Sequence, residues 1–348
     1  TTMPRLFFSL IFVFAASIVS AAEVTDLYQA QSAVASQSEE DRQRLAPELL
    51  KQVVIKVVGD RRAVEQADIS ALVTDAERYI DQFYYQQIPS PDGNSAEQQL
   101  ALTLEFNADG INNALQRIGL PVWDKIRPET LFWVAIEYAG KQQLIGEGDE
   151  DSLLFYIEQA AKKRGIPLLL PLMDLEDQTQ LTFNDVATGN NTAVKKASER
   201  YGSSVIVSAR LRGNEESVEI SWQALLGEEV ERWSSQGNVK TAIQSGVNEF
   251  ADRLGRRLNI SFSASGNTEM EIHVTGIEDY NGYSRLMDYL GSLQVVSDIK
   301  VGSLGGEKLD LVLRIQAEPE KFRQLLAMGR VIVPDATDDS GSQYRLLP

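Results

Sequence analysis

The sequence predicts a multidomain protein that combines α+β and α/β units, and three observations lead to that class. Helical patterns with a period of about 3.6 residues alternate along the chain with short strand-like runs. Two segments rich in Pro, Gly or Ser, residues 121–130 and 263–267, interrupt those patterns. The chain of 348 residues is also longer than one hydrophobic core usually serves. We therefore expect three domains, at 23–122, 127–262 and 267–348.

Residues 1–22 have the pattern of a secretory signal peptide. Arg5 precedes an apolar run over residues 6–19, and small residues offer a cleavage site after Ala21 or Ala22. A retained membrane anchor is the alternative, but the run is shorter than the ~20 residues that span a bilayer. The sequence has no Cys, which excludes a lipid-anchored lipoprotein and a disulfide scaffold. We expect a soluble periplasmic protein without a transmembrane segment after cleavage.

The first domain has an α+β pattern, in which strand-like alternation at both ends flanks two helical patterns. Pro47 is expected to kink or divide the first helix, because it lacks a backbone N–H. The expected elements are a strand (23–34), a helix opened by an S-x-x-E capping box at Ser36 and Glu39 and ended by Gly59, a helix from Ile69 to Phe83, a strand from Leu100 to Phe106 and a helix ended by Gly119.

The middle domain centres on RGIPLLLPLMDLED, Arg164 to Asp177. We expect this apolar stretch to form a strand covered on both faces, at the centre of the sheet. A strand at 131–138, a loop and a helix precede it, and a helix ended by Gly202 and a strand at 204–211 follow. This βαβαβ order predicts parallel pairing. Two further strands make the sheet mixed, and a closing helix follows them.

The third domain, 267–348, shows the order βαββαβ. Strand patterns occur at 270–274, 295–301, 309–315 and 331–333, and helical patterns begin at Tyr280 and Pro319. This order predicts a ferredoxin-like split βαβ unit, a scaffold that implies no particular activity.

Charge and composition exclude several classes of function. The net charge is −17, and we find no cluster of Lys and Arg of the kind that nucleic acid or an anionic lipid surface requires. His273 is the only histidine, and Cys is absent, so Cys-His and His-rich zinc sites cannot be assembled; we expect His273 to point outward from its strand as a plain surface histidine. We therefore assign no catalytic residue and no cofactor-binding residue.

One group of acidic residues is a candidate site. The loops after successive parallel strands leave the sheet at the same edge, so GEGDED and DLED are expected to approach each other. The residues gathered there would form a divalent-cation site or a dock for a basic partner, although helix capping and solvation are sufficient roles for them. They are Asp149, Glu150, Asp151, Asp174, Glu176 and Asp177.

Several strings resemble known families. The strings GLPVWDKIRPETLFWVAIE, RGIPLLLPLMDLED and ASERYGSSVIVSARL, with SQSEEDRQRLAPELLKQVVIKVVGDRR, resemble secreted gammaproteobacterial proteins grouped as a domain of unknown function, DUF2066. That family carries no established activity, so no site residue transfers. The middle domain also resembles the small α/β domain of periplasmic envelope proteins such as the amino-terminal domain of TolB and the curli-secretion and penicillin-binding-protein activator lipoproteins. This resemblance implies binding of protein partners in the cell envelope.

Together, these observations predict a noncatalytic periplasmic protein that binds another envelope protein during envelope assembly or maintenance. Two alternatives remain open. One is a carboxylate- or metal-dependent hydrolase at the acidic edge, which would need a divalent cation as its cofactor; the other is a small-molecule binding protein.

Overall fold

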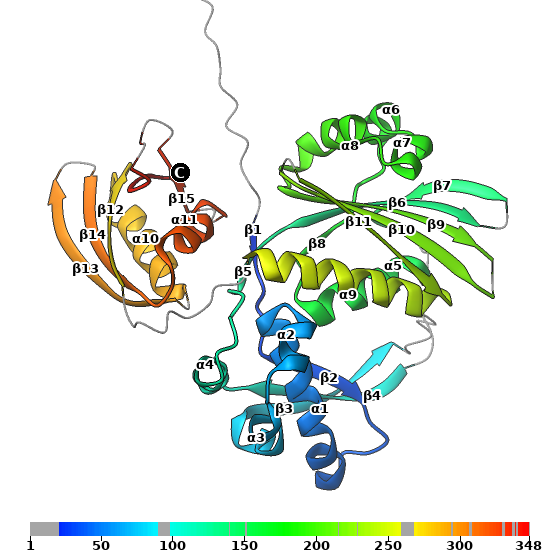
Figure 1. The fold of residues 1–348 in the computed structure, drawn as a ribbon, viewed down its shortest axis with the longest axis horizontal. Coiled ribbons are helices and arrows are strands. Elements are labelled where there is room, and N and C mark those ends of the chain that lie inside the picture. The colour runs from blue at the N-terminus through cyan, green and yellow to red at the C-terminus, as the bar shows by residue number, and fades with distance from the viewer. Residues whose placement is uncertain are drawn as a thin grey trace, which may run out of the picture.

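The computed structural model has the multidomain α+β architecture that the sequence predicts, with three groups of elements (Figure 1). No helix among the described residues has the length and apolarity needed to cross a membrane. The structure describes residues 21–89, 98–138, 140–149, 152–214, 216–227, 229–258, 268–293, 295–305, 308–328, 331–335, 338 and 340–347. The proposed signal peptide, apart from its last two residues, and the predicted linker at 263–267 lie outside this part of the chain.

The N-terminal unit packs the long helix α1 against a three-stranded antiparallel sheet of order β2-β4-β3. Leu49, Leu50 and Val53 of the helix are fully buried in the core that it forms with the sheet. The elements are β1 (Ala21–Glu23), β2 (Gln29–Ala33), α1 (Glu39–Val58), α2 (Arg61–Gln66), α3 (Ser70–Thr74), the 3-10 helix η1 (Ala76–Tyr79), β3 (Ile80–Pro89), β4 (Gln98–Phe106) and α4 (Ala108–Arg117).

Three predictions for the start of this unit need correction. Residues 23–34 form two short strands, β1 and β2, which belong to different sheets. The cap of α1 is Ser38, not Ser36: its hydroxyl accepts a hydrogen bond from Asp41 N at 3.1 Å. Pro47 does not divide α1, because burial of the residues around it outweighs the one hydrogen bond that it removes. The predicted stop at Gly59 is confirmed, with a left-handed φ of 80°.

The helix predicted from Ile69 to Phe83 is wrong in its last four residues, and the rest forms α3 and η1 instead of one helix. Helical structure ends at Tyr79, and Ile80 begins the ten-residue strand β3. The apolar spacing of this segment fits either structure, and pairing with β4, in which Phe83 lies opposite Leu104, selects the strand.

The central unit is a sheet with helices on both faces: α5 and α9 cover one face, and α6, α7 and α8 the other (Figure 1). The strand order is β11-β10-β9-β6-β7, with β6 parallel to β9. The elements are β5 (Ile126–Pro128), β6 (Thr130–Tyr138), β7 (Lys141–Ile145), α5 (Ser152–Arg164), β8 (Leu168–Leu169), α6 (Leu175–Gln180), α7 (Phe183–Thr188), α8 (Asn191–Ser198), the 3-10 helix η2 (Glu199–Tyr201), β9 (Val205–Gly213), β10 (Val218–Leu226), β11 (Glu229–Gly237) and α9 (Val239–Leu258).

The strand predicted at the centre of the sheet is instead a short edge strand. β8 has only two residues, both half-buried, and pairs in parallel with the start of β6. Pro167 and Pro171 flank it and supply no N–H for a longer ladder. The remaining edge of β6 pairs with β7, an antiparallel strand in a segment predicted as a loop. Sequence patterning found the apolarity of this stretch but not its place in the sheet.

The C-terminal unit contains the predicted βαββαβ order and one further strand. Its sheet order is β13-β14-β12-β16-β15, and α10 and α11 contribute to its core. The C-terminal strand β16 runs parallel to β12 and separates it from β15, which ends the predicted order. The elements are β12 (Thr268–Thr275), α10 (Tyr280–Ser292), β13 (Val296–Gly305), β14 (Lys308–Ile315), α11 (Pro319–Met328), β15 (Ile332–Pro334) and β16 (Gln343–Leu346).

The segment with linker composition at 121–130 is a packed junction. Trp123 is buried in the core of the central unit, and β5 pairs with β1. Arg127 is completely buried, and its guanidinium donates to backbone carbonyls of both neighbouring units, including Lys56 O at 2.8 Å and Gly165 O at 2.9 Å. The domain limits at 122 and 127 stay predictions, but the chain between them is not an exposed tether.

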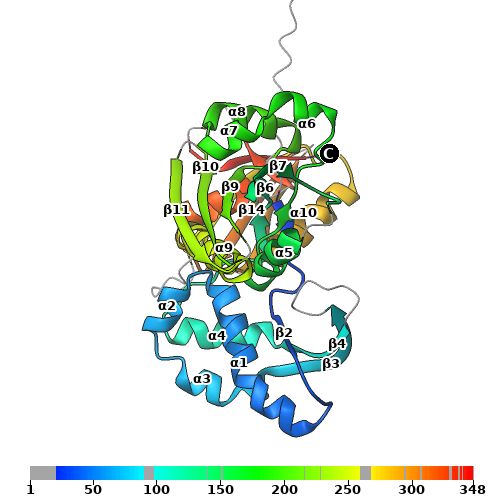
Figure 2. The same ribbon diagram turned by 90° about the vertical axis from the view of Figure 1, so that its right-hand side faces the viewer.

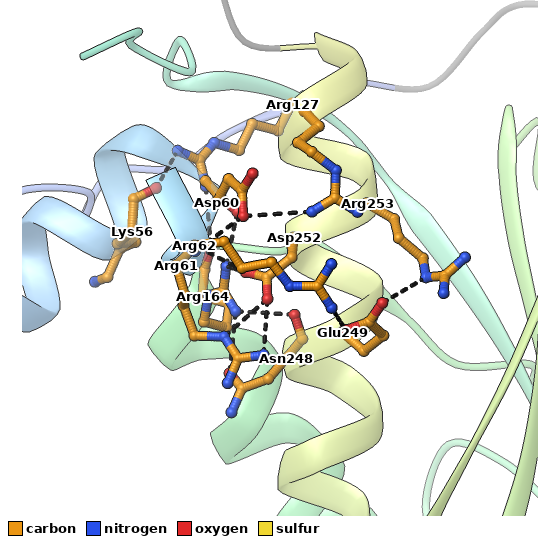
Figure 3. Close-up of polar contacts among 12 residues, drawn as sticks. Lys56, Asp60, Arg61, Arg62, Arg127, Arg164, Asn248, Glu249, Asp252 and Arg253 are labelled. Carbon is orange, nitrogen blue, oxygen red and sulfur yellow. Dashed lines mark hydrogen bonds and ion pairs between the residues drawn. The ribbon is translucent and has the colours of Figure 1, made fainter. Parts of the chain in front are cut away.

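A buried ionic cluster joins the N-terminal and central units, and we name Arg61, Arg164 and Asp252 the junction cluster (Figure 3). Asp252 of α9 accepts hydrogen bonds from Arg61 N at 3.0 Å, from Arg61 Nε at 2.8 Å and from Arg164 Nη2 at 2.7 Å. Beside it, Gly255 lies so close to Gly59 that a Cβ at Gly255 would be 2.6 Å from the Gly59 backbone. These contacts hold the two units in one arrangement.

Candidate functional site

The predicted acidic edge lies where the chain leaves β8 and enters α6. We name residues 170–177 the clamped loop, because charged side chains fix its backbone. Asp174 caps α6, and its Oδ1 accepts from Glu176 N and Asp177 N, both at 3.1 Å. Arg200, which follows α8, grips the same carboxylate with both terminal nitrogens, at 2.7 and 2.9 Å. The Arg200 hydrogen bonds, with the backbone donors, lower the pKa of Asp174 to about 2.

Asp177 holds the clamped loop from its buried side. Its side chain is buried, and Oδ2 accepts from Met173 N at 2.9 Å and from the Tyr201 hydroxyl at 2.6 Å, while Oδ1 accepts from Arg200 at 3.1 Å. The Tyr201 hydroxyl in turn accepts from Leu172 N at 2.9 Å. Burial, together with the hydrogen bond to Asp177, raises the pKa of Tyr201 to about 12. Both oxygens of Asp177 therefore serve the loop itself.

Met173 has a strained backbone at the centre of this loop. Its φ of 52° makes it the one nonglycine residue with positive φ in the part of the chain that the structure describes. Such a conformation costs on the order of 1–3 kcal/mol, and it persists only where neighbours enforce it. Here the Met173 side chain packs on the core beneath α6–α8, and its N–H is held by Asp177.

Leu172 and Leu175 project from the loop into solvent, and we name them the leucine pair. Leu172 is 51% exposed and Leu175 is 78% exposed. Met173, which lies between them in the chain, and Asp177, which follows them, occupy the positions that face the core, so the leucines do not enter it. A single exposed leucine is ordinary on a protein surface. Two of them on one strained and clamped loop make an apolar projection of defined shape.

The other predicted acidic residues divide into three cases. Asp149 folds back on its own loop, where its Oδ2 accepts from Gly146 N at 2.8 Å. Glu176 lies near Arg200, at 3.6 Å, and is half-exposed. Glu150 and Asp151 lie outside the described residues. The structure thus gathers Asp174, Glu176 and Asp177 around one arginine. Whether these acids bind a partner stays a prediction.

The two predicted loops do meet, but not for the predicted reason. Glu147 N donates to Pro171 O at 2.7 Å, which joins the GEGD loop to the clamped loop. GEGD follows β7, an antiparallel strand, so the contact arises where β7 and β8 meet end to end along β6. In the described part of the chain, no group of three or more His, Cys, Asp or Glu side chains is arranged to hold a metal ion.

Arg200, Tyr201 and the exposure of the leucine pair were not predicted from the sequence. The signal for the first two was weak: an arginine and a tyrosine just before the helix-ending Gly202. Their partners lie 23 to 29 residues earlier in the chain, beyond any local pattern.

Comparison with known proteins gives little support for an identity. A family model described as a domain of unknown function, DUF8605, matches residues 21–124, which is the N-terminal unit with the start of the junction. No curated protein sequence matches the chain. A solved structure of the LpoB C-terminal domain from Salmonella enterica is similar with a TM-score of 0.24 and 17% identity, over 36% of this chain and 89% of that one. A score of this size supports no inference. The resemblance to DUF2066 stays a prediction.

Proposed function

We propose that the protein acts without catalysis, by binding a partner protein through the leucine pair. The observation that carries this proposal is the exposure of Leu172 and Leu175 on a loop whose backbone is held by Asp174, Asp177 and Arg200. A preorganised projection loses little conformational entropy on binding. A few well-packed side chains near the centre of an interface carry most of its binding energy.

The surroundings of the leucine pair favour a partner with basic residues around an apolar pocket. Glu147 and Glu176 are exposed beside the loop, and the chain carries a net charge of −17. Charge of this sign speeds association with a basic surface and makes binding sensitive to salt. We further propose that the partner is a cell-envelope protein, since the first 22 residues have the pattern of a secretory signal.

The hydrolase alternative gains no support from this geometry. It requires the carboxylates of the acidic edge to be available to a cation or a water molecule, whereas those of Asp174 and Asp177 accept hydrogen bonds from Arg200 and from the loop backbone. His273 lies in the C-terminal unit, where its Nδ1 is 2.6 Å from Asp310 Oδ1.

Site-specific photocrosslinking in intact cells tests the proposal. A photoreactive residue at Leu175 should give one discrete adduct, which Leu172→Ser should weaken. The matched control is a photoreactive residue at Ile118, which is 39% exposed on the N-terminal unit and should not give that adduct.

Binding to the purified crosslinked partner then gives the decisive measurement. The Leu172→Ser/Leu175→Ser double variant should bind at least about 30-fold more weakly, as expected for loss of hot-spot side chains. Its melting temperature should match that of the wild type, and Ile118→Ser should bind normally. Equal affinity of the double variant and the wild type would reject the leucine pair as the contact surface.

A further inference from the structure

A polar cleft lies between the N-terminal sheet and α5 of the central unit. Figure 2 shows β2, β3 and β4 lying below α5. Two cavities of ≈ 520 and ≈ 140 Å³ share Asp26 and Lys162 in their walls and so adjoin each other. The larger is lined by four carboxylates, those of Glu23, Asp26, Glu147 and Glu158, and by one lysine, Lys162, so an anion is expected in the smaller cavity and not in the larger. The junction cluster holds the two walls together, so the cleft is preformed.

Three lysines line the smaller cavity. Lys56 of α1 is only 4% exposed, and its Nζ donates to Asp26 O at 2.9 Å and to Gln29 O at 2.8 Å. An ammonium group has three donors, and no third acceptor for Lys56 occurs among the described residues. Lys162 and Lys163 end α5 and are exposed; within the same residues neither forms an ion pair. The helix dipole accounts for basic residues at a helix end, but not for their meeting Lys56 from another unit.

Positively charged side chains lie close together at the smaller cavity. Burial lowers the pKa of Lys56 to about 8, and the positive charges of Arg127 and Lys162 act in the same direction, against Asp26. Burial likewise lowers the pKa of Arg127 to about 9. An anion in the cleft would relieve this repulsion, because an opposite charge nearby favours the protonated form. Excess positive charge at one place is notable in a chain whose net charge is −17.

Amide and aromatic side chains complete the smaller cavity. Gln52, Gln86 and Gln159 offer donors and acceptors from three different elements, and Tyr84 contributes a half-exposed ring. Such a lining suits a ligand that carries amide, amine or hydroxyl groups beside its negative charge. Asp26, whose carboxylate has no hydrogen-bond partner among the described residues, could accept from an amine.

We propose that this cleft binds carboxylate-bearing ligands of the acidic amino-acid class, either free or as residues of a short peptide. The lysines would hold the carboxylates, and the glutamines and Asp26 would hold the polar groups around them. The lysine-lined smaller cavity has no residue of the clamped loop, on which the leucine pair lies, in its wall.

Calorimetric titration of the full chain with L-glutamate and with a tri-glutamate peptide tests the proposal. At least one probe should bind, and which of them binds tells the free amino acid from the peptide. L-glutamine and inorganic phosphate are the matched controls and should bind at least about tenfold more weakly. Absence of binding by both acidic probes at millimolar concentration would overturn the proposal. Equal binding of glutamine or phosphate would overturn it as well.

Lysine variants and the pH dependence of the affinity test whether the ligand binds in the cleft. Lys162→Gln/Lys163→Gln should lower the affinity about a hundredfold, whereas Lys196→Gln, an exposed lysine at the end of α8, should not change it. Affinity should also fall as the pH rises through about 8, where Lys56 loses its proton. The charged groups around Lys56 are Asp26, Arg127 and Lys162. Unchanged affinity in the double variant would show that the ligand binds elsewhere and would reject the cleft.

Discussion

The junction cluster and the clamped loop are held by the same kinds of hydrogen bond but have different effects. In each, a buried aspartate, Asp252 or Asp177, accepts hydrogen bonds from a backbone N–H and from an arginine. Around Asp252 the two packed units bury the carboxylate completely, so its effect is to join them. Asp177 is buried as well, but Leu172 and Leu175 of the same loop are left in solvent. A buried carboxylate therefore marks a fixed position, and what the fixed backbone presents decides whether a surface is available for binding.

The largest expected effect is at Asp252. Asp252→Ala leaves Arg164 charged, buried and without its carboxylate, which typically costs about 3–5 kcal/mol of folding free energy. Chemical denaturation measures this loss. Glu249→Gln on the same helix is the control, because Glu249 pairs with Arg62 and Arg253 near the surface and its removal should cost less than about 1 kcal/mol. Equal losses in the two variants would show that burial does not distinguish these ion pairs.

A smaller loss of stability is expected at Asp177. Asp177→Asn keeps one acceptor oxygen but cannot serve the Tyr201 hydroxyl, Met173 N–H and Arg200 together, so we expect a cost of about 1–3 kcal/mol. Relative to the wild type, Asp177→Asn should speed hydrogen exchange in the clamped loop but not in β6. Glu176→Gln should change neither measurement appreciably. If Asp177→Asn leaves exchange in the loop unchanged, Asp177 does not hold its backbone.

The pH dependence of stability tests the ion pair between Asp174 and Arg200 in the clamped loop. Asp174 has its pKa lowered from 3.8 to about 2, chiefly by the hydrogen bonds from Arg200. A carboxylate with a depressed pKa contributes stability that is fully present above the unfolded value and is lost as the pH falls through the folded value. The melting temperature should therefore drop between pH 3.8 and about 2 more steeply for the wild type than for Asp174→Asn. Identical slopes would exclude a role for the Asp174–Arg200 pair in stability.

The smallest effect on stability is expected at the leucine pair. Leu172→Ser and Leu175→Ser remove side chains that are already in water, so the free energy of unfolding should change by no more than about 0.5 kcal/mol each. Leu181→Ser, in the buried core beneath the same helices, should cost several times more, about 2–5 kcal/mol. A large loss at Leu172 or Leu175 would mean that these leucines are part of the fold and not a surface for a partner.

The sequence was a good guide where local patterns decide the structure. The left-handed glycine after α1, the strand β4 and the closing helix α9 follow from glycine geometry and from apolar spacing. It failed at 69–83 and at Arg164–Asp177, where the same apolar residues fit two structures and strand pairing decided between them. Of the candidate site, it located the acidic loop. It could not show that the acids hold the loop while leucines face the solvent.

The sequence by itself determined the class of the fold, the absence of cysteine chemistry, a single histidine and helix ends such as Gly59 and Gly202, because these depend on composition or on a few neighbouring residues. Only the tertiary structure decided that Asp174 pairs with Arg200, that Asp252 of α9 binds Arg61, and that Lys56 meets Lys162 in one cleft. Each pair lies between 26 and 191 residues apart along the chain. Local sequence sets backbone preferences over one or two turns, whereas packing of whole units brings such distant charges together.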